Sequence, residues 1–379
     1  MSYLDYQTAQ VPTGFRKILY INWPLVLLIT AVSCIGFLML YSVAGGRIDT
    51  WAEPQMIRFA IGMVLMLGLA FVPMWFWRGI SVAAYVACFL MLIAVDLFGT
   101  IGMGAQRWID IGPIRIQPSE LMKIALVLLL AAYYDWLPLN RVSRPLWVLL
   151  PILLIVAPTA LVLIQPDLGT SIMLIAGGGI VMFAAGVSLW YFGAVIGAAV
   201  GLVVAVMRSR GTDWQLLKDY QFRRIDTFLD PTADPLGAGY NIIQSQIALG
   251  SGGLSGRGFM QGTQSRLNFL PEKHTDFIFT VLSEEFGFIG ASSLLVLYML
   301  ILGFCLYSAL TNRDRFASLI TIGISGTFFL YFAINMATVM GLLPAKGSPL
   351  PLVSYGGTSL MILMLGFGLV QSAHVHRPR

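Results

Sequence analysis

The stretch WPLVLLITAVSCIGFLMLYSV, residues 23–43, decides the class of fold. It contains no charged side chain and is long enough for a helix to cross about 30 Å of hydrocarbon, which takes roughly 20 residues. Arg16 and Lys17 precede it, and its length and the absence of a small-residue cleavage site distinguish it from a secretory signal. We therefore expect the segment to remain in the protein as a membrane anchor.

Stretches of the same kind recur along nearly the whole chain. They lie approximately at 23–43, 57–76, 80–98, 119–136, 146–164, 168–187, 189–207, 286–310, 316–341 and 352–372. Their apolar character is continuous, whereas strands of an outer-membrane barrel alternate in polarity. The sequence predicts an all-α integral membrane protein with about ten transmembrane helices, built as one polytopic membrane domain over residues 1–379.

The composition excludes the other broad classes of protein. Of 379 residues, 58% are hydrophobic and 11% are charged, whereas a soluble domain carries roughly a quarter of its residues as charged groups. Disordered chains need low hydrophobicity and high net charge. The net charge of +5 suits basic loops beside a membrane, so no nucleic-acid partner is predicted. The three cysteines lie in apolar runs without paired spacing, which indicates neither disulfides nor a zinc site.

The distribution of Lys and Arg predicts the orientation. In the short loops these residues are in modest excess on the side of the N-terminus, as expected of a cytoplasmic face. Residues 1–17 and 373–379 are therefore predicted to be cytoplasmic. Residues 208–285, between the seventh and eighth helices, are predicted to form a large extracytoplasmic loop. A loop of that length is uncommon unless it is functional or disordered.

Two polar segments at the predicted outer face contain ionisable residues. Glu120 and Lys123 are three residues apart at the start of a helix, so their side chains share a face. They either form a salt bridge that closes the helix end or belong to a site that faces an anionic substrate. Asp167, in Gln165-Pro-Asp at the end of the fifth span, either lines a cavity or simply ends a helix.

Asp276 stands where the long loop meets an apolar run beginning at Phe277. Partial desolvation raises the pKa of such a carboxyl and a nearby cation lowers it, a balance that suits a general base. A plain interfacial acid is the alternative. The glycine-rich segment 250–258 before it either cradles phosphate or forms flexible turns, and no Lys-Ser or Lys-Thr follows to make a nucleotide loop.

Residues 341–357 contain several prolines and glycines between two apolar spans and cannot form an ordinary helix. Irregular backbone at membrane depth is tolerated where it is buried in protein or lines a polar cavity. The segment is therefore either a structural re-entrant plug or part of a site.

These segments together resemble the SEDS family (shape, elongation, division and sporulation). The motifs are Gly104-Ala-Gln-Arg-Trp108, Gln117-Pro-Ser-Glu120, Gln165-Pro-Asp-Leu-Gly-Thr170, Tyr240-Asn-Ile-Ile-Gln-Ser245, Gln261-Gly-Thr-Gln-Ser265, Phe269-Leu-Pro-Glu-Lys-His-Thr-Asp-Phe277 and Pro349-Leu-Pro-Leu-Val-Ser-Tyr-Gly-Gly357. Pro349 and the 261–265 run resemble the elongation branch, whereas Lys346 resembles the division branch.

The resemblance implies a peptidoglycan glycosyltransferase of the bacterial inner membrane. Such an enzyme polymerises lipid II into β-1,4-linked glycan at the extracytoplasmic face during cell-wall elongation, which maintains cell shape. The implied partners are a class B penicillin-binding protein (the crosslinking transpeptidase), the nascent glycan and other membrane proteins of the elongation complex. A transporter or flippase for the lipid-linked precursor and a non-catalytic scaffold for the transpeptidase are the alternatives.

The resemblance also implies roles for single residues. Asp276 matches the catalytic carboxylate, and Lys123 is expected to hold the diphosphate and to orient Asp276. The residues implied to bind substrate are Arg107, Arg115, Gln117, Glu120, Lys123, Asp167, His274, Lys346 and Ser354. No metal ligands are implied, and a divalent cation stays open as a cofactor.

Overall fold

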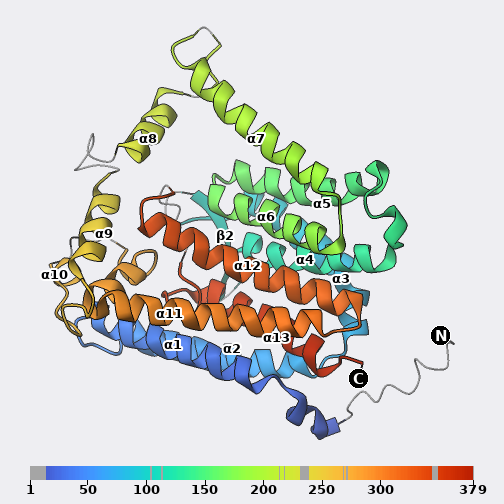
Figure 1. Ribbon diagram of the computed structural model, residues 1–379, viewed down its shortest axis with the longest axis horizontal. Coiled ribbons are helices and arrows are strands. Elements are labelled where there is room, and N and C mark those ends of the chain that lie inside the picture. The colour runs from blue at the N-terminus through green and yellow to red at the C-terminus, as the bar shows by residue number, and fades with distance from the viewer. Residues whose placement is uncertain are drawn as a thin grey trace.

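The computed structural model describes residues 14–378 apart from 103–104, 112–113, 213, 217, 231–238, 268, 270–271 and 344–348. Long helices lie side by side in a bundle, with shorter elements at its ends (Figure 1). The long helices are α1 (Trp23–Val43), α2 (Ala52–Ala70), α3 (Met74–Phe98), α4 (Pro118–Trp136), α5 (Pro145–Ile164), α6 (Leu168–Ala185), α7 (Leu189–Ser209), α11 (Ile278–Leu310), α12 (Arg315–Val339) and α13 (Gly357–Val375). The 3-10 helices η1 (Gly14–Tyr20) and η2 (Leu139–Arg141) are short.

Among the described residues, nine helices are long and apolar enough to cross a membrane. The predicted span outside that group is α4, which carries Glu120, Lys123 and Asp135. It packs against α3, α6 and α12, so its charged side chains can be accommodated within protein. The prediction of an α-helical membrane protein with about ten transmembrane helices is confirmed.

Several helix boundaries differ from the prediction. Helix α2 begins at Ala52 instead of 57, and α3 begins at Met74 instead of 80. The turn between them falls at Phe71–Pro73, inside an uninterrupted apolar run, so hydropathy could not locate it. Helix α13 begins at Gly357 instead of 352, because residues 349–356 are irregular and Leu352 has a positive φ of 65°.

Helix α11 begins at Ile278, whereas the eighth span was predicted to begin at 286. The additional residues precede a break in the helix. Gly287 has φ 64° and ψ −159°, a backbone region essentially restricted to glycine. At this point the chain around Gly256 crosses the helix, and a Cβ on Gly287 would lie 2.3 Å from the backbone nitrogen of Gly256. Residues 278–286 consequently form a separate helical segment that precedes the apolar span.

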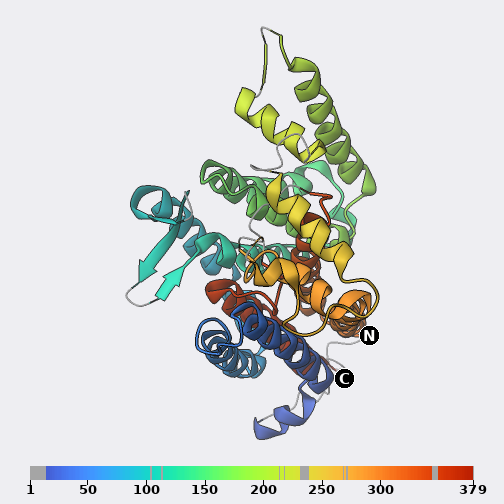
Figure 2. The same cartoon turned by 90° about the vertical axis from the view of Figure 1, so that its left-hand side faces the viewer.

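Three short strands after α3 form a small antiparallel sheet, which hydropathy did not predict. Its strands are β1 (Thr100–Gly102), β2 (Ala105–Ile111) and β3 (Ile114–Ile116), in the order β1-β2-β3. Thr100 pairs with Trp108, and Ile109 with Ile116. Figure 2 shows the sheet projecting from the side of the bundle. The alternation Trp-Ile-Asp-Ile in β2 is the strand signal that was missed.

The predicted long loop contains α8 (Asp219–Leu229), α9 (Tyr240–Ser251) and the single turn α10 (Thr263–Arg266). Helix α7 leads into it, diverges from the bundle (Figure 1) and buries none of the side chains in its apolar window. The exact bounds of the loop, 208–285, and its extracytoplasmic position stay predictions.

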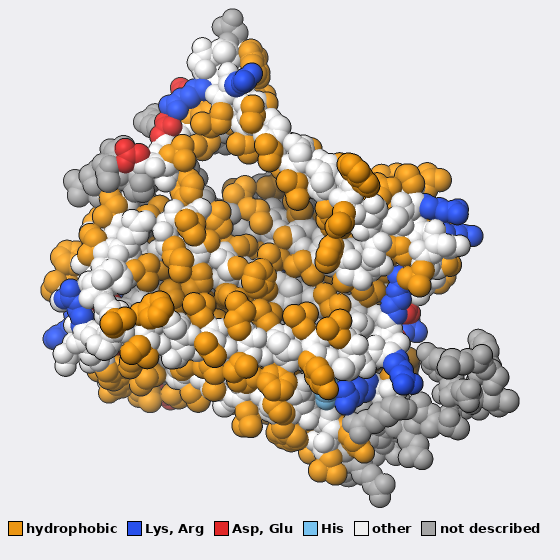
Figure 3. Space-filling model, viewed as in Figure 1, with side chains coloured by type: hydrophobic (Ala, Val, Ile, Leu, Met, Phe, Trp, Pro, Cys, Tyr) orange, Lys and Arg blue, Asp and Glu red, His pale blue; other side chains and the backbone are white. Residues whose placement is uncertain are grey.

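The first and last described segments of the chain meet at one end of the bundle. Lys17 Nζ lies 2.8 Å from His376 Nε2, whereas α9 and α10 lie at the opposite end (Figure 1). Hydrophobic side chains cover the long side of the bundle, and Lys and Arg gather toward its ends (Figure 3). This distribution matches a protein whose middle lies in hydrocarbon.

We expect Gly36→Ala to destabilise the fold. Helix α1 crosses residues 352–353 so closely at Gly36 that a Cβ would lie 2.7 Å from the Cα of Val353, and backbone cannot move aside as a side chain can. Overpacking of this kind costs about 1–3 kcal/mol of the free energy of unfolding. Thermal unfolding of the purified protein measures it. Gly68→Ala, in α2 with no atom within 4 Å of the added carbon, is the matched control, and equal stability of the two variants would contradict the close crossing.

Candidate active site

A cavity of about 410 Å³ lies at the end of the bundle opposite the contact between Lys17 and His376. It is bounded by β2, the starts of α4 and α6, the turn 272–276 and the segment 349–359. The lining residues used below are Arg107, Trp108, Gln117, Glu120, Asp167, Thr170, Glu272, Thr275, Asp276, Tyr331, Tyr355, Gly357, Thr358 and Ser359. Motif segments that are far apart in the sequence therefore meet in one place.

The turn that carries Asp276 is held by its backbone. Three consecutive carbonyl oxygens each accept a hydrogen bond from another part of the chain. The backbone N–H of Tyr355 donates to His274 O (2.9 Å), the Ser354 hydroxyl to Thr275 O (2.5 Å), and Asn335 Nδ2 to Asp276 O (2.9 Å). We call this set the carbonyl clamp. It fixes the position of the turn through the backbone alone, and Asp276 lines the cavity.

The Asp276 carboxyl is strongly perturbed. Burial raises its pKa to about 6, and the negative charge of Glu272 acts in the same direction. Among the described residues no Lys or Arg forms an ion pair with it. The expected contact with Lys123 is absent from the structure, because the Lys123 ammonium is held by other groups. Desolvation therefore dominates the acidity of Asp276.

Lys123 belongs to a buried network below the cavity. Its Nζ donates to Glu120 Oε1 at 2.5 Å and also to the Tyr331 hydroxyl, which in turn donates to Glu120 Oε2. Glu120 is 7% and Lys123 is 4% exposed. Glu120 lines the cavity, whereas Lys123 lines a smaller space beneath it. The predicted helix-face pair is confirmed as an ion pair, and its carboxylate lies at the cavity wall.

Arg107 is the described basic residue that lines the cavity itself. Its guanidinium donates to the carbonyl oxygens of Gln165 (3.0 Å) and Pro166 and lies 3.9 Å from Asp167 Oδ2. Asp167 caps α6 by accepting from the Thr170 backbone N–H at 3.0 Å. Gln117 Nε2 donates to Asp167 Oδ2 at 3.3 Å. These contacts attach the sheet to the start of α6. Arg107, Gln117 and Asp167 therefore lie in one wall of the cavity.

Two other residues implied to bind substrate, Arg115 and His274, lie near this cavity and are not among its described lining residues. Arg115 is exposed on β3, 3.4 Å from Asp110, with its guanidinium 5.1 Å from the ring centroid of Trp108. The His274 ring stacks on Trp51 at 4.1 Å. Lys346 falls outside the described residues. Their substrate-binding roles stay predictions.

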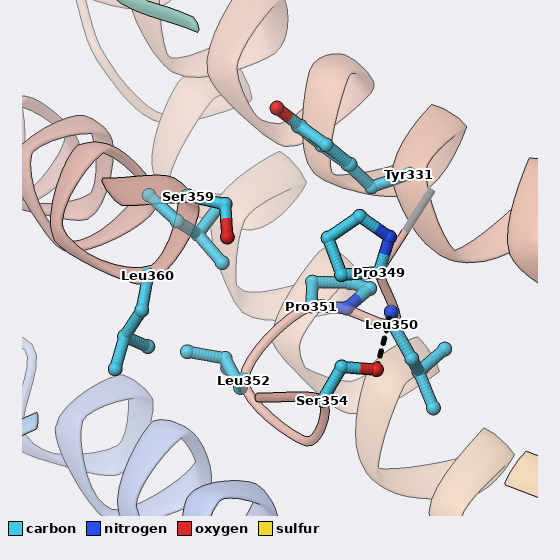
Figure 4. Close-up of a pocket in the computed structure, with 9 residues that line it drawn as sticks. Tyr331, Pro349, Leu350, Pro351, Leu352, Ser354, Ser359 and Leu360 are labelled. Carbon is cyan, nitrogen blue, oxygen red and sulfur yellow. Dashed lines mark hydrogen bonds between the residues drawn. The ribbon is translucent and has the colours of Figure 1, made fainter. Parts of the chain in front are cut away.

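Ser354 is buried between two loops. Its hydroxyl donates to Thr275 and accepts from the backbone N–H of Leu350 at 2.8 Å. Figure 4 shows the second bond within the proline-containing segment, beside a small space lined by Tyr331 and Ser359. Ser354 thus connects the irregular segment to the turn of Asp276, which assigns it a positioning role.

Sequence reasoning missed two residues of the site, Tyr331 and Asn335. Both lie on α12, four residues apart and therefore on one face. Tyr331 joins the Glu120–Lys123 pair, and Asn335 completes the carbonyl clamp. Their polar character at helical spacing within an apolar run was the available signal.

The cavity is richer in acids than the sequence suggested. Glu120, Asp167, Glu272 and Asp276 line it together with Arg107. Among the described residues no three His, Cys, Asp or Glu side chains converge as a group that could hold a metal ion. A divalent cation as a cofactor stays a prediction.

The fold and the cavity define a class: a polytopic membrane protein with a charged site at the end of its bundle and a perturbed carboxyl group at the centre of that site. The sequence profile of the FtsW/RodA/SpoVE family, described as cell cycle proteins, matches residues 22–379. The chain belongs to this family, which is the SEDS family.

Individual relatives extend the comparison over nearly the whole chain. The peptidoglycan glycosyltransferase MrdB of Escherichia coli K12 is 44% identical over 355 residues, covering 93% of each chain. A chain from a structure described as structural coordination of polymerization and crosslinking by a peptidoglycan synthase complex is 31% identical, with a TM-score of 0.79 over 93% of this chain and 97% of that one. The crystal structure of the Thermus thermophilus rod shape determining protein RodA is 28% identical, with a TM-score of 0.71 over 95% and 98%.

We expect Tyr331→Phe to lower the free energy of unfolding by about 1–3 kcal/mol, because the buried Glu120 and Lys123 both lose a hydrogen-bond partner. Chemical or thermal unfolding in detergent measures the change. Tyr307→Phe, in an exposed position on α11, is the control and should differ little from the parent protein. A neutral Tyr331→Phe would show that the buried network does not depend on this hydroxyl.

Proposed function

We propose that this chain is a peptidoglycan glycosyltransferase that polymerises lipid II into β-1,4-linked glycan during cell-wall elongation. The observation that carries the proposal is the Asp276 carboxyl, which lies in the cavity with a pKa raised to about 6. A carboxyl in that range is deprotonated at neutral pH and still basic enough to accept a proton. Family membership and the MrdB relative, whose name states this activity, support the same conclusion.

The reaction is an inverting displacement at a sugar carbon. Asp276 accepts the proton of the acceptor hydroxyl as that oxygen forms a bond to the anomeric carbon of the donor. The bond between the anomeric carbon and the phosphate oxygen breaks, and the polyprenyl diphosphate leaves with its electron pair. The carbonyl clamp maintains the position of the base during this step, because catalytic groups act only within hydrogen-bond reach of the proton they accept.

The departing diphosphate needs positive groups on the opposite side of the cavity. Arg107 lines the cavity, and Lys123 lies beneath it through Glu120 and Tyr331. The first turn of α13, at Gly357–Ser359, also lines the cavity, and its N-cap residue, Gly356, has no side chain to cap the backbone N–H groups. A helix N-terminus of this kind favours anions. Together these groups provide the electrostatic stabilisation that the leaving group requires.

The placement of polar groups favours polymerisation over transport. A flippase needs polar side chains along a path through the membrane. Here the charged side chains gather at the two ends of the bundle, while its described middle is filled by aromatic residues such as Tyr298, Phe328, Phe332 and Phe367. A scaffold for the transpeptidase would have no need of a basic carboxyl in a cavity.

The proposed enzyme acts in a particular membrane and together with partner proteins. We infer a multi-pass position in the bacterial inner membrane, with both termini cytoplasmic and the cavity extracytoplasmic. The likeness to a chain of a peptidoglycan synthase complex in which polymerization and crosslinking are coordinated supports a class B penicillin-binding protein as partner. The other proposed partners are lipid II, the nascent glycan and further membrane proteins of the elongation complex.

Asp276→Asn should abolish polymerisation, because the amide cannot accept the proton of the acceptor hydroxyl. Purified protein with its transpeptidase partner is incubated with lipid II, and glycan length is measured on gels. Asp49→Asn, in an exposed position after α1, is the matched control and should retain activity. Polymerisation by a folded Asp276→Asn protein would remove the base assignment and leave the scaffold and transporter alternatives.

The rate of polymerisation should fall as pH decreases through about 6. The raised pKa means that Asp276 becomes protonated, and so inactive as a base, near this value. Glu272→Gln should move the falling limb to lower pH, because it removes a negative charge that raises the pKa of Asp276. Initial rates of the parent and variant from pH 4.5 to 8 test both statements. A limb that stays in place in Glu272→Gln would contradict the coupling between the two carboxyl groups.

A further inference from the structure

The start of α2 contacts both segments that form the carbonyl clamp. Trp51 immediately precedes α2, and Gln55 and Arg58 follow it at spacings of four and three residues, so the three side chains lie on one face. The Trp51 ring stacks on the His274 ring, with the centroids 4.1 Å apart, and meets the Tyr355 ring edge-on at 4.8 Å. The Arg58 guanidinium lies 4.8 Å from the centroid of the Tyr355 ring. The proposed reaction uses no side chain of this face.

Gln55 contacts residues 354–356 through both ends of its amide. Its Nε2 donates to the carbonyl oxygen of Ser354 at 3.0 Å, and its Oε1 accepts from the backbone N–H of Gly356 at 3.4 Å. The Gln55 side chain is 1% exposed, so water does not take the place of these partners. A buried amide that spans two backbone groups holds both of them, and the loss of either bond leaves a buried polar group unsatisfied.

Ser354 links Gln55 to the turn 272–276. The carbonyl oxygen of Ser354 accepts from Gln55, while its hydroxyl donates to the carbonyl oxygen of Thr275 at 2.5 Å. The next residue donates its backbone N–H to the same turn at 2.9 Å. Two of the three bonds of the carbonyl clamp therefore come from a segment that Gln55 holds, and the third comes from α12.

Gln55 is not part of the cavity wall. The described lining of the cavity contains Tyr355 and Gly356 but not Gln55, which contacts the backbone of this segment from α2. A substrate in the cavity would therefore not touch Gln55. Any effect of Gln55 on turnover must act through the backbone that it holds.

We propose that Gln55 is a positioning residue: it holds residues 354–356 and thereby keeps the turn 272–276 where Asp276 can accept the proton of the acceptor hydroxyl. The inference rests on the proposed polymerase function and adds a residue that contacts neither the cavity nor Asp276. A base must lie within hydrogen-bond reach of the proton that it accepts. A displacement of about 1 Å can lower the rate roughly a hundredfold. Helix α2 packs against α13 and so provides a firm support for the segment.

The test replaces Gln55 with Met, which has a similar length and cannot form either hydrogen bond. Polymerisation by the purified protein with its transpeptidase partner is measured over a range of lipid II concentrations. We expect kcat to fall about 10- to 100-fold, because the base is displaced. KM should change little, because Gln55 is not in the described lining of the cavity. Gln55→Asn is the second variant. Its amide is one methylene shorter and cannot span both partners, so kcat should fall while the buried position stays polar.

Gln371→Met is the matched control. Gln371, on α13, is 0% exposed, and its amide also spans two backbone groups: it accepts from the Asn22 N–H at 2.9 Å and donates to Asn22 O at 3.1 Å. This pair lies toward the end of the bundle where Lys17 meets His376, away from the cavity. Thermal unfolding in detergent should show a similar loss of stability for the two Gln→Met variants, whereas Gln371→Met should keep the kcat of the parent.

The pH profile provides a readout that a general loss of stability would not move. Burial raises the pKa of Asp276 to about 6, so a turn that is no longer held should admit water to the carboxyl and lower its pKa. The falling limb of the rate should therefore shift to lower pH in Gln55→Met and stay in place in Gln371→Met. Neither substitution changes the other titratable and charged groups described on the turn and in the cavity lining, which are Arg107, Glu120, Asp167, Glu272, Lys273, His274, Tyr331 and Tyr355.

A double-mutant cycle tests the path through Ser354. In Ser354→Ala the hydroxyl bond from the segment to the turn is already lost. The further fall in kcat on adding Gln55→Met should then be smaller than the fall in the parent, because residues in one network are coupled. Losses that simply multiply would overturn this path.

The outcomes separate the positioning role from the polymerase function. A parent protein that, with its partner, fails to lengthen lipid II overturns the polymerase function. A parent that polymerises, with Gln55 variants that fold and keep both its kcat and its pH limb, overturns only the positioning role. Equal losses of kcat in Gln55→Met and Gln371→Met lead to the same conclusion. If Gln55→Met does not fold, Gln55→Asn decides between these outcomes.

Discussion

The carbonyl clamp is the constraint on which the site depends. Residues 274–276 lie in a connection between helices, where no regular structure fixes the backbone. Three hydrogen bonds from α12 and from the segment 354–355 supply that order instead. Because the acceptors are backbone carbonyls, the clamp fixes the turn without occupying the Asp276 carboxylate. The irregular proline-containing segment thus supports the turn that carries Asp276 and also forms a wall of the cavity.

Lys123 and Asp276 are both largely removed from water, but among the described residues only Lys123 has a partner of opposite charge. Lys123 is enclosed by Glu120 and Tyr331, so its charge reaches the cavity mainly through that network. Asp276 has no such partner among the described residues, and its pKa rises accordingly. The carboxylates of Glu120 and Asp276 therefore differ in environment, since Glu120 is held in an ion pair and Asp276, within the described part of the chain, is not.

Hydropathy predicted the membrane class and most helices, because long apolar runs need no knowledge of the rest of the fold. It could not locate the turn at Phe71–Pro73, where the apolar run continues through the change of direction. In the site, the spacing of Glu120 and Lys123 predicted their pairing. The participation of Tyr331 depends on how α12 is rotated against α4, and packing between helices decides that rotation. Local sequence cannot supply it.

The crossing of Gly256 and Gly287 has a consequence for how this chain can change over generations. A Cβ on Gly287 would collide with the backbone at Gly256, and one on Gly256 would lie 2.1 Å from Glu285 O. Both residues also have positive φ. Neither can be replaced first and repaired by a later change at the other, because each contact is to main chain. Side-chain contacts can be restored by a compensating substitution, whereas this backbone contact cannot. The crossing therefore also keeps the backbone of Glu285 in place.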